Sequence, residues 1–280
     1  MLTVIKNFKN LFLSFSFLIF FVSCQSNPIS GRNQLFIVSE SMAINSSKEA
    51  YSGLIKNLKE EEKLNVDKKE FERLVSITEK LVFQAVNYRD ESKNWNWNIN
   101  LIDNDEIVNA WCMAGGKMAM YSGLIKQLNA TDDEIAQVMG HEIAHALLSH
   151  TREKISRGLA LQASMAVMAI KLDDTKYKGL ALQGISFATI LALELPNSRS
   201  AETESDVLGI EIAAKAGYDP KAAVSLWKKM SKLKDKETNE FFSTHPSSEN
   251  RISKLQNLIP AANKFYMDES IIRGSFKVNK

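Results

Sequence analysis

The sequence predicts an α+β protein that is mostly α-helical and carries one small antiparallel or mixed sheet beside a central helix. Apolar residues recur at helical spacing over residues 42–58, 71–87 and 131–149, which predicts three amphipathic helices. Residues 95–102 alternate between polar and apolar side chains, as in a half-buried strand, and residues 107–120 supply further strand and a hairpin. A small sheet is therefore expected just before the central helix.

The rest of the chain predicts more helices and no second domain. Helices are expected over residues 220–233 and 248–258. Residues 158–170 and 179–195 are rich in Ala, Leu, Met and Ile, but each run is shorter than the roughly 20 residues that span a membrane. We expect buried helices there, and a hairpin on a membrane surface or a partner is the alternative. Residues 41–280 are expected to form a single domain with one substantial core.

Residues 1–23 have the pattern of a secretion signal. Two lysines precede an apolar run of about a dozen residues, 11–22, and Cys24 follows. Such a run fits a signal peptide better than a spanning helix, which needs roughly 20 residues. An uncleaved membrane anchor is the alternative.

Cys24 stands at the expected cleavage point. The residues before it, Phe21-Val22-Ser23, resemble a bacterial lipobox, with Phe in place of the commoner Leu. That resemblance implies a mature chain that begins at Cys24 and carries acyl groups on this residue. It implies a lipoprotein of the bacterial cell envelope, on the periplasmic side of the outer membrane. Residues 24–40 are polar and turn-rich, and we expect them to form a tether and N-terminal arm.

Composition limits the partners and the disulfides. The chain has 35 basic and 33 acidic residues, and the two lysines of the predicted signal account for the excess of positive charge. The remainder is formally neutral, so no nucleic-acid partner is expected. If Cys24 is lipidated, Cys112 is the one cysteine that remains, which excludes an intramolecular disulfide. We expect Cys112 to act as a small buried apolar residue.

The most informative motif is the pentapeptide H-E-I-A-H at residues 141–145, inside the predicted central helix. On a helix His141 and His145 lie one turn apart on one face, where both imidazoles can bind a single zinc ion. Glu142 can take a proton from a metal-bound water, which makes it the candidate general base. The segment Thr131–Glu134 carries a capping-box signature for the start of this helix. Two histidines packed by chance in a core are the alternative.

A catalytic zinc ion usually has three protein ligands, so the two histidines leave the site incomplete. One known extension places Gly and a third His shortly after the pentapeptide, but Leu148 and Thr151 occupy those positions here. His150 lies five residues after His145, which turns it off the ligand face of a continuous helix, and we expect a structural role for it. A distant carboxylate is the better candidate for the third ligand.

Glu202 and Asp206 share one face of a helix that is expected to begin after residues 196–197. One carboxylate can bind the metal, and the other can hydrogen-bond a ligating histidine and so set its tautomer. Glu204 and Glu211 are the competing carboxylates. Glu204 points roughly away from the first two, so we expect it to be solvated or to form a local salt bridge. A plain charged helix face is the alternative.

The pattern H-E-x-x-H followed by S-R-x-x-E-x-x-A-D resembles the gluzincin family of zinc metallopeptidases that contains HtpX, the CAAX prenyl endopeptidases and the periplasmic proteases BepA and LoiP. Residues 141–145 and 198–206 carry the resemblance, with Ser205 in place of the usual Ala. It implies a zincin-like domain in which Asp206 supports the zinc ligands, which are His141, His145 and Glu202. No repeat array follows, so the chain is more similar to the short LoiP branch than to BepA.

Residues 109–125 resemble the family's N-A-x-x-x-P-G-G element, with Ala114 where the family has Pro. Gly115 and Gly116 allow a tight reversal. We expect the next residues to form an edge strand that pairs with an extended substrate: Lys117, Met118, Ala119, Met120 and Tyr121. An ordinary hairpin without this role is the alternative.

Residues 244–252 resemble a T-H-P-x-x-x-x-R-I element of the BepA and LoiP branch. In BepA-like members this histidine can approach the zinc. We therefore expect His245 either to occupy the open coordination position at rest or to stabilise the charged intermediate. A histidine that caps the loop before the last helix is the alternative.

The resemblance implies a zinc-dependent endopeptidase with one zinc ion per chain. An edge strand recognises extended backbone more than particular side chains, which favours unfolded or misfolded envelope polypeptides as substrates. The membrane, reached through a lipid on Cys24, and the outer-membrane assembly machinery are the other expected partners. The alternative is a metal-binding chaperone or assembly factor with little proteolysis, and the presence of Glu142 argues against it.

Overall fold

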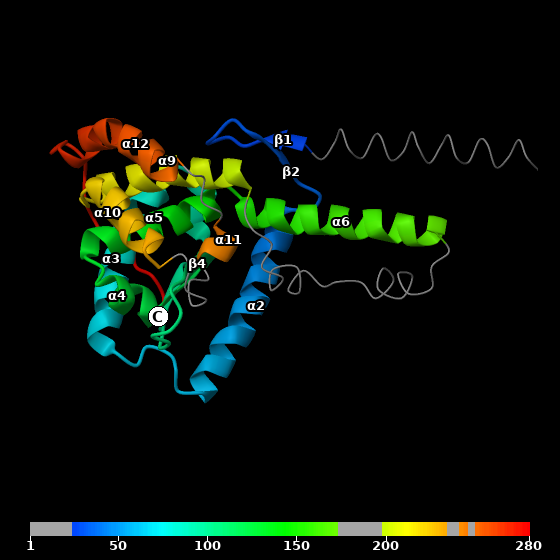
Figure 1. Ribbon diagram of the computed structural model, residues 1–280, viewed down its shortest axis with the longest axis horizontal. Coiled ribbons are helices and arrows are strands. Elements are labelled where there is room, and N and C mark those ends of the chain that lie inside the picture. The colour runs from blue at the N-terminus through cyan, green and yellow to red at the C-terminus, as the bar shows by residue number, and fades with distance from the viewer. Residues whose placement is uncertain (1–23, 173–197, 234–240, 246–249) are drawn as a thin grey trace, which may run out of the picture.

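Helices make up most of the computed structural model, which describes residues 24–172, 198–233, 241–245 and 250–280. Two of them, α5 (Asp132–Leu147) and α9 (Arg199–Lys215), pack against each other in the body of the molecule (Figure 1). The other helices of the described chain are α2 (Glu40–Glu60), α3 (Lys68–Ala85), η1 (Asp90–Asn94), α4 (Ser122–Leu128), α6 (His150–Leu172), α10 (Lys221–Ser231), α11 (Phe241–Thr244) and α12 (Arg251–Tyr266). Together with the small sheet, they confirm the predicted α+β class, mostly helical.

A three-stranded sheet lies beside α5, with its strands in the spatial order β3 (Asn98–Ile102), β5 (Lys117–Tyr121) and β4 (Ala110–Met113). Strand β5 runs parallel to β3 and antiparallel to β4, so the sheet is mixed, as predicted. The prediction that Lys117–Tyr121 forms an edge strand is wrong, because β5 is central and is paired on both sides. The sequence predicts the antiparallel pairing of β5 with β4 through the hairpin, but it does not predict the parallel pairing of β5 with β3.

The two edges of the sheet differ in how they are covered. The outer side of β3 is occupied by the C-terminal segment: Ile99 N donates to Asn279 O at 3.1 Å, and Asn279 N donates to Trp97 O at 2.9 Å. Strand β4 packs against α5, and no other strand of the described chain pairs with its outer side. The unpaired edge of the sheet therefore lies next to the central helix.

The turn between β4 and β5 depends on two glycines. Gly115 and Gly116 have φ angles of +77° and +74°, in the left-handed region that disfavours side chains. A Cβ on Gly116 would also lie 2.4 Å from Cε3 of Trp97. The predicted tight reversal at these residues is confirmed.

Helices α5 and α9 approach closely because each presents a glycine to the other. A Cβ on Gly140 would lie 2.8 Å from the carbonyl oxygen of Gly209, and a Cβ on Gly209 would lie 2.7 Å from the backbone nitrogen of His141. Real Cβ atoms essentially never come this close to other atoms. The absence of two side chains thus places α9 directly against the backbone of the first histidine of the pentapeptide.

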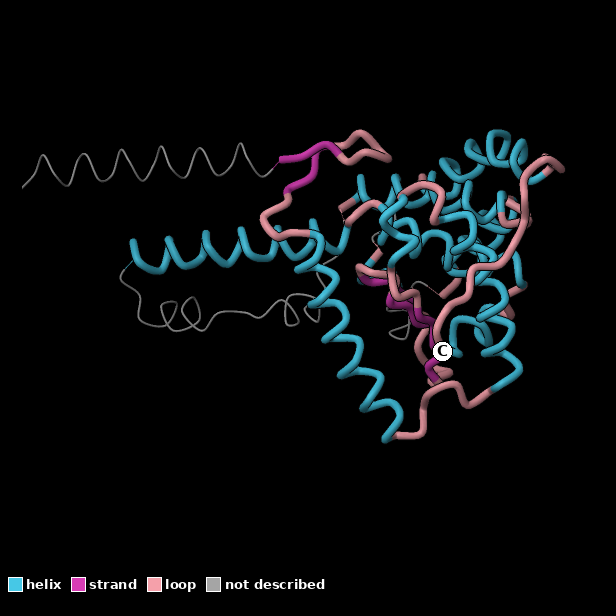
Figure 2. Tube along the Cα trace, turned by 180° about the vertical axis from the view of Figure 1, so that it is seen from behind, coloured by secondary structure: helices cyan, strands magenta, loops and turns pink. Residues whose placement is uncertain are grey.

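Residues 24–35, expected as part of a tether, form a hairpin that is docked on the body. Strand β1 (Cys24–Ser26) pairs antiparallel with β2 (Asn33–Leu35). Asn27 Nδ2 and Gln34 Nε2 both donate to the carbonyl oxygen of Leu148 at 2.9 Å. The hairpin therefore contacts the junction between α5 and α6, and both views show it beside the first part of α6 (Figures 1 and 2).

Helix α6 extends away from the body (Figure 2). It includes the helix predicted over residues 158–170, but Leu161 is 57% exposed, so the prediction that this helix is buried is wrong at this point. The other apolar run, residues 179–195, and the predicted signal, residues 1–23, lie outside the described residues. Among the helices that the structure describes, none is long and apolar enough to cross a bilayer.

Candidate metal centre

Helix α5 begins where the sequence predicts. Thr131 Oγ1 accepts a hydrogen bond from Glu134 N at 3.3 Å, and Thr131 N donates to Glu134 Oε2 at 3.0 Å, so the capping box is confirmed. From this start, His141 and His145 fall one turn apart on the same buried side, and their Nε2 atoms lie 3.0 Å apart. The helix thus presents two imidazole nitrogens to one point in space.

Helix α9 brings a carboxylate to the same point. Ser198 caps its N-terminus by accepting a hydrogen bond from Ala201 N at 3.2 Å, which places Glu202 in the first turn. Glu202 Oε2 lies 3.3 Å from His141 Nε2, and Glu202 Oε1 lies 3.3 Å from His145 Nε2. The candidate third ligand therefore faces both histidines.

His245, at the end of α11, closes the cluster from a third side. Its Nδ1 lies 3.1 Å from Glu202 Oε1, and its ring stacks on Phe241 with 4.3 Å between the ring centroids. One ligand atom from each of four buried residues lies within 4.8 Å of the others: His141, His145, Glu202 and His245. The structure thus brings together residues that the sequence separates by about a hundred positions.

The cluster fits a zinc ion. Three imidazoles and one carboxylate are the donor types that zinc prefers, and four donors suit its tetrahedral geometry. Two Nε2 atoms that face each other at 3.0 Å need a proton or a cation between them. In addition, Glu142 Oε1 is buried and has no hydrogen-bond partner within the described residues, although it lies 3.5 Å from His245 Nε2. An ion in the cluster would satisfy the facing imidazole nitrogens and the carboxylate, and Glu142 is the neighbouring carboxylate that could take a proton from a water on that ion.

Burial and neighbouring charges set the protonation states of the cluster. Burial alone would raise the pKa of Glu202, but the charge of His245 and the hydrogen bonds from His141 and His145 hold this pKa far below its usual range. Burial lowers the pKa of His145 well below its ordinary value and raises the pKa of the Glu142 carboxyl. Glu202 therefore offers an ionised carboxylate and His145 a neutral imidazole, which are the states that bind a metal.

Asp206 and Arg251 lie behind the ligands. Asp206 Oδ1 is 3.1 Å from His141 Nδ1, the ring nitrogen that faces away from the cluster. Arg251 donates to Asp206 Oδ1 at 2.6 Å and to Glu202 Oε2 at 2.9 Å, and its guanidinium lies 3.8 Å from the ring centroid of Trp227. The sequence marks Arg251 as part of a motif, but its contact with two carboxylates of the site follows only from the fold.

His150 and Glu204 were not expected near the metal ligands. His150 Nδ1 lies 2.8 Å from His145 Nδ1, and His150 Nε2 lies 3.0 Å from Glu204 Oε2. The expectation that His150 points away assumed one continuous helix to about Ser149. Instead α5 ends at Leu147, and Ser149 has a φ of +56°, so His150 starts a new helix in a different direction.

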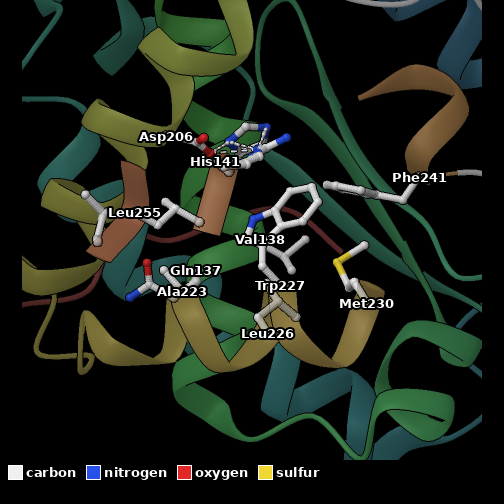
Figure 3. A pocket seen from close by; sticks show the side chains of 12 residues that line it. Gln137, Val138, His141, Asp206, Ala223, Leu226, Trp227, Met230, Phe241 and Leu255 are labelled. Atoms are coloured by element: carbon white, nitrogen blue, oxygen red, sulfur yellow. Dashed lines mark hydrogen bonds and ion pairs between the residues drawn. The ribbon is translucent and has the colours of Figure 1, made fainter. Parts of the chain in front are cut away.

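Apolar side chains form the floor under the site (Figure 3). They come from α5, α10, α11 and α12, and include Val138, Leu226, Trp227, Met230, Phe241 and Leu255. The cavity between them and His141 has a volume of about 20 Å³, which is room for roughly one water molecule. It is too small for a substrate side chain, so these residues support the metal ligands.

The two cysteines occupy different environments. Cys24 is exposed at the start of β1, and Cys112 is buried in β4. Burial, and after it the charge of Glu142, raises the pKa of the Cys112 thiol well above its ordinary value. The expected role of Cys112 as a small buried residue agrees with this environment.

Comparison with known proteins identifies the family. Residues 68–259 match peptidase family M48. The mitochondrial metalloendopeptidase OMA1 of Homo sapiens is 30% identical over 277 residues, which cover 92% of this chain and 51% of that protein. Metalloprotease YcaL of Escherichia coli is 30% identical over 156 residues, or 54% of this chain and 58% of that protein. Metalloprotease LoiP of the same organism is 26% identical over 159 residues, or 55% of this chain and 60% of that protein.

These relatives refine the resemblance drawn from the motifs. LoiP is among them, as expected, but OMA1 proteins cover more of this chain, and a BepA-like relationship in particular is not confirmed. The chain spans about half the length of most of the OMA1 proteins it matches. The family match covers more than half of the chain and includes α5 and α9, the two helices that carry candidate metal ligands. The chain therefore belongs to peptidase family M48, a family of zinc-dependent metallopeptidases.

Proposed function

We propose that this protein is a lipid-anchored zinc endopeptidase that hydrolyses unfolded or misfolded polypeptides of the bacterial cell envelope. The position of Glu142 is the observation that most strongly supports peptidase activity. One buried oxygen of Glu142 has no hydrogen-bond partner among the described residues, and it lies beside the candidate zinc ligands His141, His145 and Glu202. A protein that only stored or sensed zinc would not need a buried carboxylate oxygen without a hydrogen bond at this position.

Each component of the site would have a separate role in peptide-bond hydrolysis. A bound zinc ion would polarise the scissile carbonyl and lower the pKa of its water. Glu142 then accepts the proton of the attacking water and passes it to the departing amine, which is the general acid–base role that its raised pKa suits. His245 either provides a fourth ligand at rest or stabilises the negative charge that develops on the substrate, since its ring lies between Glu142 and Glu202.

The unpaired edge of β4 supports an extended, unfolded substrate. Strand β4 lies against α5, and an extended peptide could add to its outer side as a further strand. Backbone hydrogen bonds of this kind do not depend on particular side chains. A folded protein has few segments that are free to pair in this way, which is why we propose unfolded chains as the substrates.

Peptidase specificity for the unfolded state can be tested with one substrate protein in two forms. We would compare a stable protein with a destabilised point variant of it that is unfolded at the assay temperature, using the Glu142→Gln variant as the control for contaminating proteases. The proposal predicts that the unfolded form is cleaved much faster. Equal cleavage of both forms would contradict it, and binding of the unfolded form without cleavage would indicate the chaperone alternative.

The envelope location is proposed from the residues that precede the hairpin. The basic start, the apolar run and the lipobox-like residues before Cys24 support a lipoprotein, and exposure of Cys24 leaves its thiol free for modification. The lipid would hold the protein at the periplasmic side of the outer membrane, where the assembly machinery is a candidate partner. Acyl labelling that disappears in Cys24→Ser, together with precursor accumulation in globomycin, is the expected result. Unlabelled wild-type protein would contradict the proposal.

A further inference from the structure

A chain of hydrogen bonds runs outward from the metal ligand His145 to the N-terminal hairpin. His145 Nδ1 lies 2.8 Å from His150 Nδ1, and His150 Nε2 lies 3.0 Å from Glu204 Oε2. The other oxygen of Glu204 accepts a hydrogen bond from Arg32 Nε at 2.6 Å. Arg32 belongs to the turn of the hairpin between β1 and β2. This series of hydrogen bonds therefore connects α5, α6, α9 and the N-terminal hairpin.

The metal site permits only one arrangement of protons along this chain. His145 Nε2 faces the other ligands and must be unprotonated to bind a metal, so the proton of its neutral ring lies on Nδ1. Among the described residues, His150 Nδ1 is the atom within hydrogen-bond distance of this N–H, so it must be an acceptor. The hydroxyl of Ser205, 3.3 Å from the same nitrogen, can donate to it as well. The proton of a neutral His150 consequently lies on Nε2, where it donates to the Glu204 carboxylate.

The two ligand histidines are thus supported by equivalent arrangements. His141 contacts a carboxylate directly, at Asp206, and this carboxylate is bonded by Arg251. His145 reaches a carboxylate through the ring of His150, and that carboxylate is bonded by Arg32. Partners of this kind fix the tautomer and orientation of a ligating histidine and raise its basicity.

Arg32 is held in place by more than Glu204. Its two terminal nitrogens donate to the two oxygens of Glu153 on α6, at 2.8 and 2.6 Å, and Gln34 Nε2 donates to Glu153 Oε2 at 2.9 Å. This two-pronged contact has defined geometry, unlike a single exposed ion pair. The position of the hairpin is therefore coupled to the orientation of Glu204, and through His150 to His145.

We infer that His150, Glu204 and Arg32 are positioning residues for the zinc ligand His145, and that the hairpin of residues 24–35 is a functional part of the metal site. This inference rests on the zinc site of the proposed function but not on its substrate or its location. If the hairpin also carries the lipid, the segment that positions His145 is the same segment that is tethered to the membrane.

The test measures zinc affinity of the full chain by competition with a chromophoric chelator at fixed pH, so it does not need a substrate. His150→Leu removes the acceptor for His145, and we expect zinc to bind about 10–100-fold more weakly. His150→Asn places an amide oxygen near the former Nδ1, and we expect it to recover most of that loss. Recovery by Asn would separate the hydrogen bond from the packing of the ring.

Two variants test the outer hydrogen bonds of the series that runs from His145 to Arg32. Glu204→Gln and Arg32→Ala should weaken zinc binding in the same direction but less than His150→Leu. Glu211→Gln is the matched control on α9, since Glu211 bonds Tyr88 and Lys215 away from the metal ligands. For the hairpin the control is Arg152→Ala, because Arg152 donates to Val38 O and stacks on Phe36 without touching Glu204.

A spectroscopic readout distinguishes positioning from a general loss of stability. In the cobalt-substituted protein the visible absorption reports the geometry of the ligands, and we expect it to change in His150→Leu and Glu204→Gln and to stay unchanged in both controls. Zinc affinity and cobalt spectra that equal those of the wild type in all folded variants would overturn the inference. Equal losses in the controls would overturn it as well. Zinc binding without peptidase activity in the wild type would instead contradict the proposed function alone.

Discussion

The replacement of Gly209 by Ala tests whether the approach of α5 and α9 builds the metal site. A Cβ at this position would lie 2.7 Å from the nitrogen and 2.8 Å from the Cα of His141, and 2.9 Å from the carbonyl carbon of Gly140. All three neighbours are backbone atoms, so no side chain can rotate away. The helices must separate or tilt, and Glu202 and Asp206 on α9 must then move relative to His141 on α5.

The size of the effect follows from two opposing terms. Overpacking a well-filled interior costs about 1–3 kcal/mol. Ala is favoured over Gly inside a helix by about 1 kcal/mol. The net expectation for the metal-free Gly209→Ala variant is a loss of about 0–2 kcal/mol in the free energy of unfolding, together with weaker zinc binding because the ligands on the two helices no longer converge.

Gly53→Ala is the matched control. Gly53 lies inside α2, and a Cβ there would have no heavy atom within 4 Å, so only the helix-propensity gain of about 1 kcal/mol applies. We would measure denaturant unfolding of both metal-free variants and their zinc affinities by chelator competition. The difference between the two variants isolates the steric cost. If Gly209→Ala is as stable as Gly53→Ala and binds zinc like the wild type, the close approach of α5 and α9 does not build the metal site.

Three further predictions concern the site and the sheet. Burial lowers the pKa of His141, but the hydrogen bonds that His141 donates to Asp206 and Glu202 outweigh burial and raise this pKa to about 9 without metal, so zinc binding at pH 7 should release a proton. The stabilisation of the metal-free fold by protonated His141 is complete below about pH 6.5 and is lost as the pH rises through about 9, and zinc affinity increases over the same range. Calorimetry of zinc binding in buffers of different ionisation enthalpy measures the proton release. Zinc binding at pH 7 without proton release would contradict the raised pKa of His141. His245→Ala should lower zinc occupancy or turnover, and a variant that changes neither would remove His245 from the site. Deletion of residues 277–280 should lower the free energy of unfolding by about 1–3 kcal/mol, because Val278 is buried and Asn279 covers the edge of β3; an unchanged denaturation midpoint would contradict this.

Local sequence patterns predicted the parts of the site that depend on one helix. The capping box at Thr131 sets the start of α5, and the spacing of His141 and His145 then places both rings on one face. The same spacing argument predicted that Glu202 and Asp206 act together on α9. Helix geometry left Glu204 and Glu211 as competitors, and it was the resemblance to the metallopeptidase family that assigned the ligand role to Glu202.

Features that depend on contacts between distant segments were not predictable in this way. The parallel pairing of β3 with β5 puts Lys117–Tyr121 in the middle of the sheet and leaves β4 at an edge to which no other described strand is added. The break at Ser149 turns His150 toward His145, because one residue with a positive φ redirects the chain. Arg32 reaches Glu204 only because the hairpin docks on α6, a contact between residues 172 positions apart.

The role of Glu142 as the base of a zinc peptidase can be measured by casein cleavage with wild type and Glu142→Gln. The zinc content of both proteins must be measured in the same samples, because only then is loss of the base separated from loss of the metal. We expect Glu142→Gln to keep its zinc, since Glu142 is not among the candidate ligands, and to lose activity by a factor of about 10²–10⁴. Casein cleavage at the wild-type rate by a zinc-loaded Glu142→Gln variant would contradict the role of Glu142 as the base.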